Sequence, residues 1–285
     1  MPSLIDIRRR IRSVKSTQQI TRAMKLVSSA KLRRAQDRVL AARPYSAILA
    51  RLLADVARAA RSDERLTHPL LAERPERRIQ LILITADRGL AGAFNSNLIK
   101  AAQQFLAEHE GQPIEMETIG RKGRDFFRKR RATLSGEHVG ATEKVTYPYV
   151  AEIARQVMAR FAAGEIDAVY LLYNEFKSIM TQRLVVARIL PVAVPVEGDP
   201  IEYIYEQSPA ELLAKLLPRY VEIAIYQALL ESGAAQQAAR MTAMDAATTN
   251  ASDMIERLTL YMNRVRQASI TKEIIEVVSG AAVVD

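Results

Sequence analysis

The sequence contains no cysteine, and that absence excludes several chemistries at once. Without a thiol, the chain has no disulfide, no thiolate metal ligand and no cysteine nucleophile. It also lacks an apolar run near the roughly 18 residues that a membrane-spanning helix needs. The opening MPSLIDIRRR has no apolar centre of the kind found in secretory signals. We therefore expect a soluble protein, or at most a peripheral membrane component.

Glycine and proline are missing from long stretches at both ends of the chain. Neither residue occurs over 3–43 or 234–279, whereas nine of the eleven glycines lie between Gly89 and Gly198. Stretches of this length without helix breakers, rich in Ala, Leu, Arg and Gln, predict helices about 60–70 Å long. Ser208, followed by Pro209, is typical of a helix start. Two such helices in one chain would pair most simply in antiparallel fashion.

Apolar spacing predicts where these two helices touch. Steps of three and four residues in the C-terminal helix predict a coiled-coil seam. The N-terminal helix has three apolar stripes that do not join in register, which predicts a seam that drifts around the helix. Pro44 is expected to kink it. The C-terminal seam is Met241, Met244, Thr248, Ala251, Ile255, Leu258, Met262 and Val265. The N-terminal stripes are Leu4, Ile7, Ile11 and Val14, then Ile20, Met24 and Val27, then Leu32, Ala35, Val39 and Ala42.

The middle of the chain alternates between strand-like and helix-like patterns. This alternation predicts an α/β layer domain with a mostly parallel sheet, in addition to the long antiparallel coiled coil of the terminal helices. The expected strands are 79–85, 114–119, 168–173 and 183–194, and the expected helices are 96–108, 121–131 and about 150–161. The domain boundaries that follow are 1–60 for the N-terminal shaft helix, 61–207 for the α/β domain and 208–285 for the C-terminal shaft helix.

The net charge of +9 is concentrated at the N-terminus. Residues 1–60 hold 14 Lys or Arg and 3 Asp or Glu, residues 61–207 hold 20 of each, and residues 208–285 hold 7 and 9. A basic helix of this density indicates an acidic protein partner or nucleic acid. Residues 1–60 contain one aromatic residue, Tyr45, so they offer no platform for stacking bases.

No pattern in the chain is typical of an active site. Gly89 to Gly92 departs from G-x-G-x-x-G, so a tight turn is favoured over a phosphate-binding loop. Gly120 to Gly123 could hold an anion at a helix start, although a capped turn explains it better. The three histidines are expected in loops or at a helix end, without a second ligand at metal-binding spacing. Glu115 and Glu117 share one strand face and are expected to face solvent. We therefore predict no catalytic residue, metal or cofactor.

Three segments resemble a known family. Residues 20–36, ITRAMKLVSSAKLRRAQ, are similar to the N-terminal helix of the gamma subunit of rotary F-type ATP synthases. Residues 264–282, RVRQASITKEIIEVVSGAA, resemble that subunit's C-terminal signature, and residues 87–95, DRGLAGAFN, resemble its central-domain motif. The matches occur in order along the whole chain.

The resemblance implies a central rotor stalk without an active site of its own. The terminal helices would form a shaft inside a hexameric ring of alpha and beta subunits. The α/β domain would lie near the epsilon subunit and the membrane c-ring, with one copy of the chain per complex. The family couples proton flow to ATP synthesis or hydrolysis. This resemblance implies a peripheral protein on the cytoplasmic face of a bacterial plasma membrane, and the missing cysteines imply that it has no thiol switch.

The resemblance also assigns candidate contact residues. Met24 matches a methionine near the beta-subunit lever, although coiled-coil packing alone would also explain it. Solvated helix faces would likewise explain Arg266 and Glu273. The implied ring-contact and coupling residues are Met24, Arg240, Arg266, Gln267, Thr271 and Glu273, and the implied contacts with the rotor ring are Tyr203, Tyr205 and Glu206. The alternative function is a basic coiled-coil scaffold that binds nucleic acid.

Overall fold

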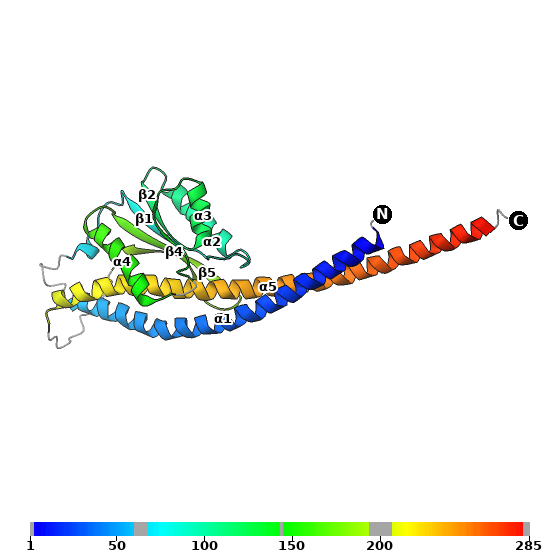
Figure 1. Cartoon of the computed structure of the whole chain (residues 1–285). Coiled ribbons are helices and arrows are strands. Elements are labelled where there is room, and N and C mark those ends of the chain that lie inside the picture. Colours follow the sequence, from blue (N-terminus) through cyan, green and yellow to red (C-terminus); the bar gives the residue numbers. More distant parts are fainter. Residues whose placement is uncertain (1–2, 60–67, 143–144, 194–206, 282–285) are drawn as a thin grey trace. The chain divides into compact units, whose positions relative to one another are not determined.

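The computed structural model describes residues 3–59, 68–142, 145–193 and 207–281 of the chain (Figure 1). They form two compact units, one made of residues 1–28 and 240–285 and the other of residues 29–239. Two long helices, α1 (Leu4–Ala59) and α5 (Pro209–Ala281), contribute to both units. The predicted pair of terminal helices is therefore confirmed.

Both long helices begin with a side-chain cap. The Ser3 hydroxyl accepts a hydrogen bond from the backbone N–H of Asp6 (3.2 Å) and donates one to the Asp6 carboxylate (2.8 Å). The Ser208 hydroxyl accepts from the N–H of Glu211 (3.3 Å), as its position before Pro209 predicts. α1 spans 56 residues and continues through Pro44. α1 stays continuous because Pro44 removes only one backbone hydrogen bond from a helix that is otherwise free of helix breakers and held by packing.

The first unit is an antiparallel pair of helices. The predicted seam of α5 is confirmed, because its positions are buried or half-buried from Met241 to Val265. The predicted drift of the α1 seam is wrong. Buried and half-buried positions in α1 keep alternating steps of four and three residues, and several of them are polar. In this unit they are Leu4, Ile7, Ile11, Val14, Gln18, Thr21, Lys25 and Ser28, with the half-buried Met24 beside Lys25.

The second unit contains a five-stranded sheet in the order β3-β2-β1-β4-β5. The four strands from β3 to β4 are parallel, and β5 pairs with β4 in antiparallel fashion, so the predicted mostly parallel sheet is confirmed. All six residues of β1 are buried, as expected for a central strand covered on both faces. The strands are β1 (Ile79–Ile84), β2 (Ile114–Ile119), β3 (Leu134–His138), β4 (Ala168–Phe176) and β5 (Gln182–Leu190).

Helices cover both faces of this sheet. Figure 1 shows α2 and α3 together on one side of the sheet, and α4 on the other. Ile82 and Ile84 of β1 belong to a core cluster with α4, α1 and α5, whereas Leu83 points toward Gly123 of α3. The remaining helices are the short 3₁₀ helix η2 (Pro69–Leu71), α2 (Phe94–Glu108), α3 (Arg121–Lys129) and α4 (Tyr147–Ala162).

Three strands differ from the prediction by more than one residue. β4 continues to Phe176, three residues beyond its predicted end at Tyr173. β3, with the sequence LSGEH, was not expected, because it is a short, half-exposed edge strand without β-branched residues. β5 begins at Gln182 and ends at Leu190, before Pro191, whereas the apolar pattern predicted a strand to Val194. Proline has no N–H to donate to a ladder, which explains the earlier end. Within the described residues, no helix is both long and apolar enough to cross a bilayer.

Candidate functional site on the paired terminal helices

Polar side chains join the two helices of the first unit at three successive levels. The pairs are Gln18–Ser252 (2.6 Å), Thr21–Thr248 (2.8 Å) and Lys25–Asp245 (2.5 Å). Residue numbers rise along one helix as they fall along the other, as antiparallel pairing requires. Polar seam residues restrict a coiled coil to the alignment in which they find partners. The three pairs therefore specify how α1 and α5 are aligned.

Because polar residues occupy this part of the seam, apolar residues of α1 point outward. Ile20 and Val27, predicted in the seam, are 57% and 55% exposed. Apolar side chains gathered on an exposed surface indicate contact with another protein. The exposed apolar residues of this unit are Ile5, Ile20, Leu26 and Val27 on α1, and Met254, Leu260, Tyr261, Ile270, Ile274 and Ile275 on α5.

The same stretch of α1 carries a dense set of cations. Within the described residues, Lys25 pairs with Asp245, whereas none of the exposed cations forms an ion pair with a carboxylate, and the one acidic residue among 1–28 is Asp6. A surface that mixes unpaired cations with apolar residues is more typical of a contact with an acidic protein than of a solvent-exposed face. The exposed cations are Arg8, Arg9, Arg10, Arg12, Lys15 and Arg22.

The candidate coupling residues fall into two groups. The first group is Met24 and Arg240, which are both half-buried. Met24 is next to Lys25, and the ion-pair partner of Lys25, Asp245, lies five residues along α5 from Arg240. The others occupy the exposed C-terminal part of α5, about 39 Å farther along the helix axis. These exposed residues are Arg266, Gln267, Thr271 and Glu273.

Local bonds hold part of the second group. The Thr271 hydroxyl donates to the carbonyl of Gln267 (2.9 Å), and the Glu273 carboxylate accepts from the Ser269 hydroxyl (3.2 Å). These bonds lie within α5, so they leave the outer surface of the side chains available. The predicted rotor-ring contacts Tyr203, Tyr205 and Glu206 lie outside the described residues.

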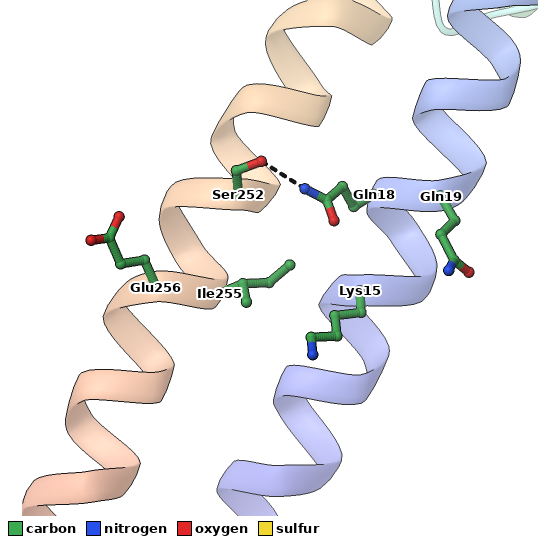
Figure 2. A pocket seen from close by; sticks show the side chains of 6 residues that line it. All are labelled: Lys15, Gln18, Gln19, Ser252, Ile255 and Glu256. Carbon is green, nitrogen blue, oxygen red and sulfur yellow. Dashed lines mark hydrogen bonds between the residues drawn. The ribbon is translucent and has the colours of Figure 1, made fainter.

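A shallow hollow of about 330 Å³ lies between the helices in the first unit (Figure 2). Gln18 and Ser252 line it and are hydrogen-bonded to each other, and Ile255 is the one apolar side chain in its lining. Small-molecule sites are mostly apolar and enclose most of their ligand. This hollow is open and has one apolar side chain in its lining, so we assign it no ligand.

In the second unit, the glycine-rich turn after β1 is closed by its own side chains. The buried Asp87 carboxylate accepts from the backbone N–H groups of Arg121 and Gly140 (both 3.0 Å) and from the Thr142 hydroxyl (2.7 Å). Asn95 accepts from the N–H of Ala86 (2.9 Å). An acidic side chain placed at the turn would repel a phosphate, which favours the tight-turn interpretation.

The start of α3 has no free backbone donors for an anion. The N–H groups of its first three residues donate to Asp87, to the carbonyl of Ala86 (3.1 Å) and to the Thr85 hydroxyl (2.9 Å). Gly120 precedes them with φ 110°, a conformation that L side chains rarely adopt. The motif is therefore a capped turn, and the alternative of an anion site is wrong.

The expectation that Glu117 faces solvent is also wrong. Its carboxylate is buried, accepts from Gln80 Nε2 (2.7 Å) and contacts His138 Nε2 (2.7 Å). His138 lies on β3 rather than in a loop, and its Nδ1 is 2.8 Å from the Tyr149 hydroxyl. The unpredicted edge strand thus covers Glu117. No cluster of three or more metal-binding side chains occurs in the part of the chain that the structure describes.

Comparison with known proteins assigns these features to a family. Residues 3–284 match the family described as ATP synthase. The chain is 63% identical to the ATP synthase gamma chain of Solibacter usitatus over 99% of both chains, and 53% identical to that of Pelotomaculum thermopropionicum over the full length of both. A chain of the Euglena gracilis mitochondrial ATP synthase has the same fold, with a TM-score of 0.68 at 18% identity, over 98% of this chain and 93% of that one.

The fold defines a stalk protein, which combines two long paired helices with an α/β domain. The chain belongs to the ATP synthase family, as one of its gamma chains. Its function is that of the central stalk of the synthase. Nothing in the comparisons supports the alternative of a nucleic-acid scaffold.

Proposed function

We propose that the chain is the rotating shaft through which proton flow across a membrane rotor drives ATP synthesis, or is driven by ATP hydrolysis, at sites on beta subunits. The main support is the 63% identity to an ATP synthase gamma chain over almost the whole length of both chains. In this proposal the protein is peripheral, on the cytoplasmic face of a bacterial plasma membrane.

The mechanism needs an asymmetric surface rather than an active site. One shaft presents different faces to three chemically identical sites, so each site experiences a different bias between its open and closed conformations. A ligand changes such an equilibrium only by its differential affinity for the two conformations. By linkage, nucleotide binding and release must bias the shaft angle by the same free energy.

The first unit would supply this surface. Met24 and Arg240 would contact the ring at one level, and Arg266, Gln267, Thr271 and Glu273 would contact it about 39 Å farther along α5. The unpaired cations of α1 would face acidic loops of the beta subunits. The exposed apolar residues Ile20 and Val27 beside them would be covered by the ring, since a surface of this composition resembles a protein interface more than a solvated face.

The α/β domain would connect the shaft to the membrane rotor. We assign this role to residues 61–207, with Tyr203, Tyr205 and Glu206 toward the c-ring and the epsilon subunit beside the domain. Residues 1–60 and 208–285 would form the shaft. One copy per complex follows from a shaft that occupies the axis of a hexameric ring.

Affinity purification from gently solubilised membranes tests the proposal. A tagged chain should recover alpha, beta and epsilon subunits together with the c-ring, with one gamma chain per three beta subunits as measured by quantitative mass spectrometry. The purified chain alone should hydrolyse no ATP. Recovery of nucleic acid without these subunits would sink the proposal, as would ATP hydrolysis by the isolated chain.

A further inference from the structure

The C-terminal end of β4 lacks a strand on one side. β4 pairs with β1 as far as Leu172, whereas its pairing with β5 continues to Phe176. The last residues of β4 therefore extend beyond the β1 ladder. Backbone N–H and C=O groups in this situation need other partners when they are buried, and Phe176 is buried.

One residue from each long helix supplies those partners. The N–H of Phe176 donates to Glu231 Oε2 of α5 (3.0 Å), and its carbonyl accepts from Arg43 Nη2 of α1 (2.7 Å). The same two side chains also bind each other. Arg43 Nε donates to Glu231 Oε1 (2.9 Å), and Arg43 Nη2 donates to Glu231 Oε2 (3.0 Å). Four hydrogen bonds thus join α1, α5 and β4 at one point of the second unit.

The geometry of this cluster is restrictive. Arg43 and Glu231 form a two-pronged contact between a planar guanidinium and a carboxylate, which requires a defined orientation of both groups. The Glu231 side chain is 2% exposed and that of Arg43 is 37% exposed. The hydrogen bonds that Arg43 donates to Glu231 raise the pKa of the guanidinium, so it stays charged. Rotation of either helix about its axis would break bonds to the other helix and to the strand.

The other contacts between these helices and the sheet are mainly apolar. Leu53 and Val56 of α1, with Leu217 and Val221 of α5, pack in the core cluster that includes Phe161 of α4. Apolar burial is strong but has no direction. A second polar cluster joins α5 to α4 through Tyr147 and Glu222, and α5 to α1 through Arg219 and Tyr45, but it contains no strand residue. Within the described residues, the Arg43–Glu231 pair binds both helices and the strand together.

We propose that Arg43 and Glu231 are positioning residues that transmit torque between the sheet of the α/β domain and the two shaft helices. They would act as a joint that keeps the end of β4 in one rotational setting relative to α1 and α5. This inference rests on the proposed rotary function, because a joint of this kind matters only where the two elements must turn together.

The test uses the assembled synthase in inverted membrane vesicles. ATP hydrolysis and ATP-driven proton pumping are measured on the same vesicles for the wild type, Arg43→Ala, Arg43→Lys and Glu231→Gln. We expect Arg43→Ala to lower protons pumped per ATP by about fivefold, within the usual range of coupling effects. Arg43→Lys keeps the charge but loses the two-pronged contact, so its decrease should be smaller than that of Arg43→Ala. Glu231→Gln should also lower the number of protons pumped per ATP.

The matched control is Arg183→Gln. It removes an exposed ion pair to Glu175 (2.8 Å) at the same end of the sheet, but this pair joins β5 to β4 and involves no helix. Pumping per ATP should stay at the wild-type value in this variant. An equal decrease in the control would assign the effect to general loosening of the sheet and overturn the proposal.

Two measurements separate assembly from coupling: the amount of assembled complex and the number of protons pumped per ATP. A merely structural role would reduce the amount of assembled complex while leaving pumping per ATP unchanged in what remains, and that outcome overturns the proposal. If Arg43→Ala fails to assemble, Arg43→Lys and Glu231→Gln decide by the same criterion. If the wild-type chain is not incorporated into a pumping complex at all, the rotary function itself fails, which is distinct from failure of the joint.

Discussion

Gly120 shows how one residue can determine a whole connection. It has φ 110°, and a Cβ atom built on it would lie 2.1 Å from the carbonyl oxygen of Thr85. That oxygen belongs to the buried residue directly after the central strand, so it has no room to move. Backbone of β2 and α3 therefore approaches β1 more closely than any side chain would permit.

We predict that Gly120→Ala lowers the free energy of unfolding by at least about 3 kcal/mol, through backbone strain and overlap with Thr85. Urea denaturation of the full chain measures this change. Gly111 is a matched control because it also has a positive φ, 94°, but has nothing within 4 Å of a built Cβ. Gly111→Ala should cost about 1 kcal/mol. Equal costs at the two positions would contradict the steric argument.

Tyr147 makes stability depend on alkaline pH. Burial, and then its hydrogen bond to Glu222, raise the pKa of the phenol to about 12. In the unfolded chain this pKa is about 10. Because the folded chain holds the proton more tightly, the stabilisation is complete below about pH 10 and is lost as the pH rises to about 12.

Tyr147→Phe should therefore flatten the decrease of the melting temperature between about pH 10 and pH 12. Calorimetry of the wild type and the variant over this range measures the slope. Tyr173, whose burial also raises its pKa to about 12, remains in both proteins, so part of the slope should persist. Parallel curves for the two proteins would show that the Tyr147 proton is not linked to folding.

At the scale of single elements, the seam of the first unit is the feature least apparent from composition. Apolar spacing favoured Ile20 and Val27 as contact positions, but Gln18 and Thr21 occupy the seam instead. Their partners lie on α5, more than 220 residues away in sequence. A polar residue is suited to a seam only when its partner is known, so one helix read alone does not reveal the contact.

The absence of natural cysteines allows a direct test of this alignment. The hydroxyl oxygens of Thr21 and Thr248 are 2.8 Å apart. Thr21→Cys with Thr248→Cys should therefore form a disulfide in nearly all molecules under mild oxidation, since their side chains point at each other. Electrophoresis without reductant after proteolysis between the helices measures the cross-link.

The control pair replaces Ile20 rather than Thr21. Ile20 points away from α5, so Ile20→Cys with Thr248→Cys should cross-link in a small minority of molecules. Efficient cross-linking of this second pair would instead support the seam that apolar spacing predicted.

The elements of the α/β domain differed in how well they could be predicted. The bounds of α2, α3 and β2 follow from local apolar periodicity, and the predicted ranges agree within two residues. β3 could not be predicted, because its half-exposed pattern becomes a strand only through pairing with β2. The burial of Glu117 depends on the same pairing, since His138 of β3 covers it.

At the scale of the whole molecule, Met24 tests whether the first unit acts as a shaft surface. Met24 is half-buried beside the seam, so a lysine at this position could extend its ammonium group toward a neighbouring subunit without disrupting the seam. We predict that the synthase with Met24→Lys assembles and hydrolyses ATP but pumps several-fold fewer protons per ATP, because a new charge alters the bias on the surrounding sites.

Pumping and hydrolysis on the same vesicles measure the Met24→Lys effect, and Met24→Leu is the control that preserves an apolar contact. Met24→Leu should retain wild-type coupling. Unchanged pumping per ATP in Met24→Lys would remove Met24 from the contact residues, while leaving the stalk function itself intact.

The sequence by itself determined the two long helices, the class of the α/β domain and the family. These properties depend on local features: missing breakers, alternating apolar patterns and three contiguous motifs. Only the tertiary structure decided which faces the helices share, that Glu117 is buried, and that Arg43 and Glu231 meet at Phe176. Each of these depends on partners that are distant in sequence, and a polar side chain carries no local mark of the partner that will satisfy it.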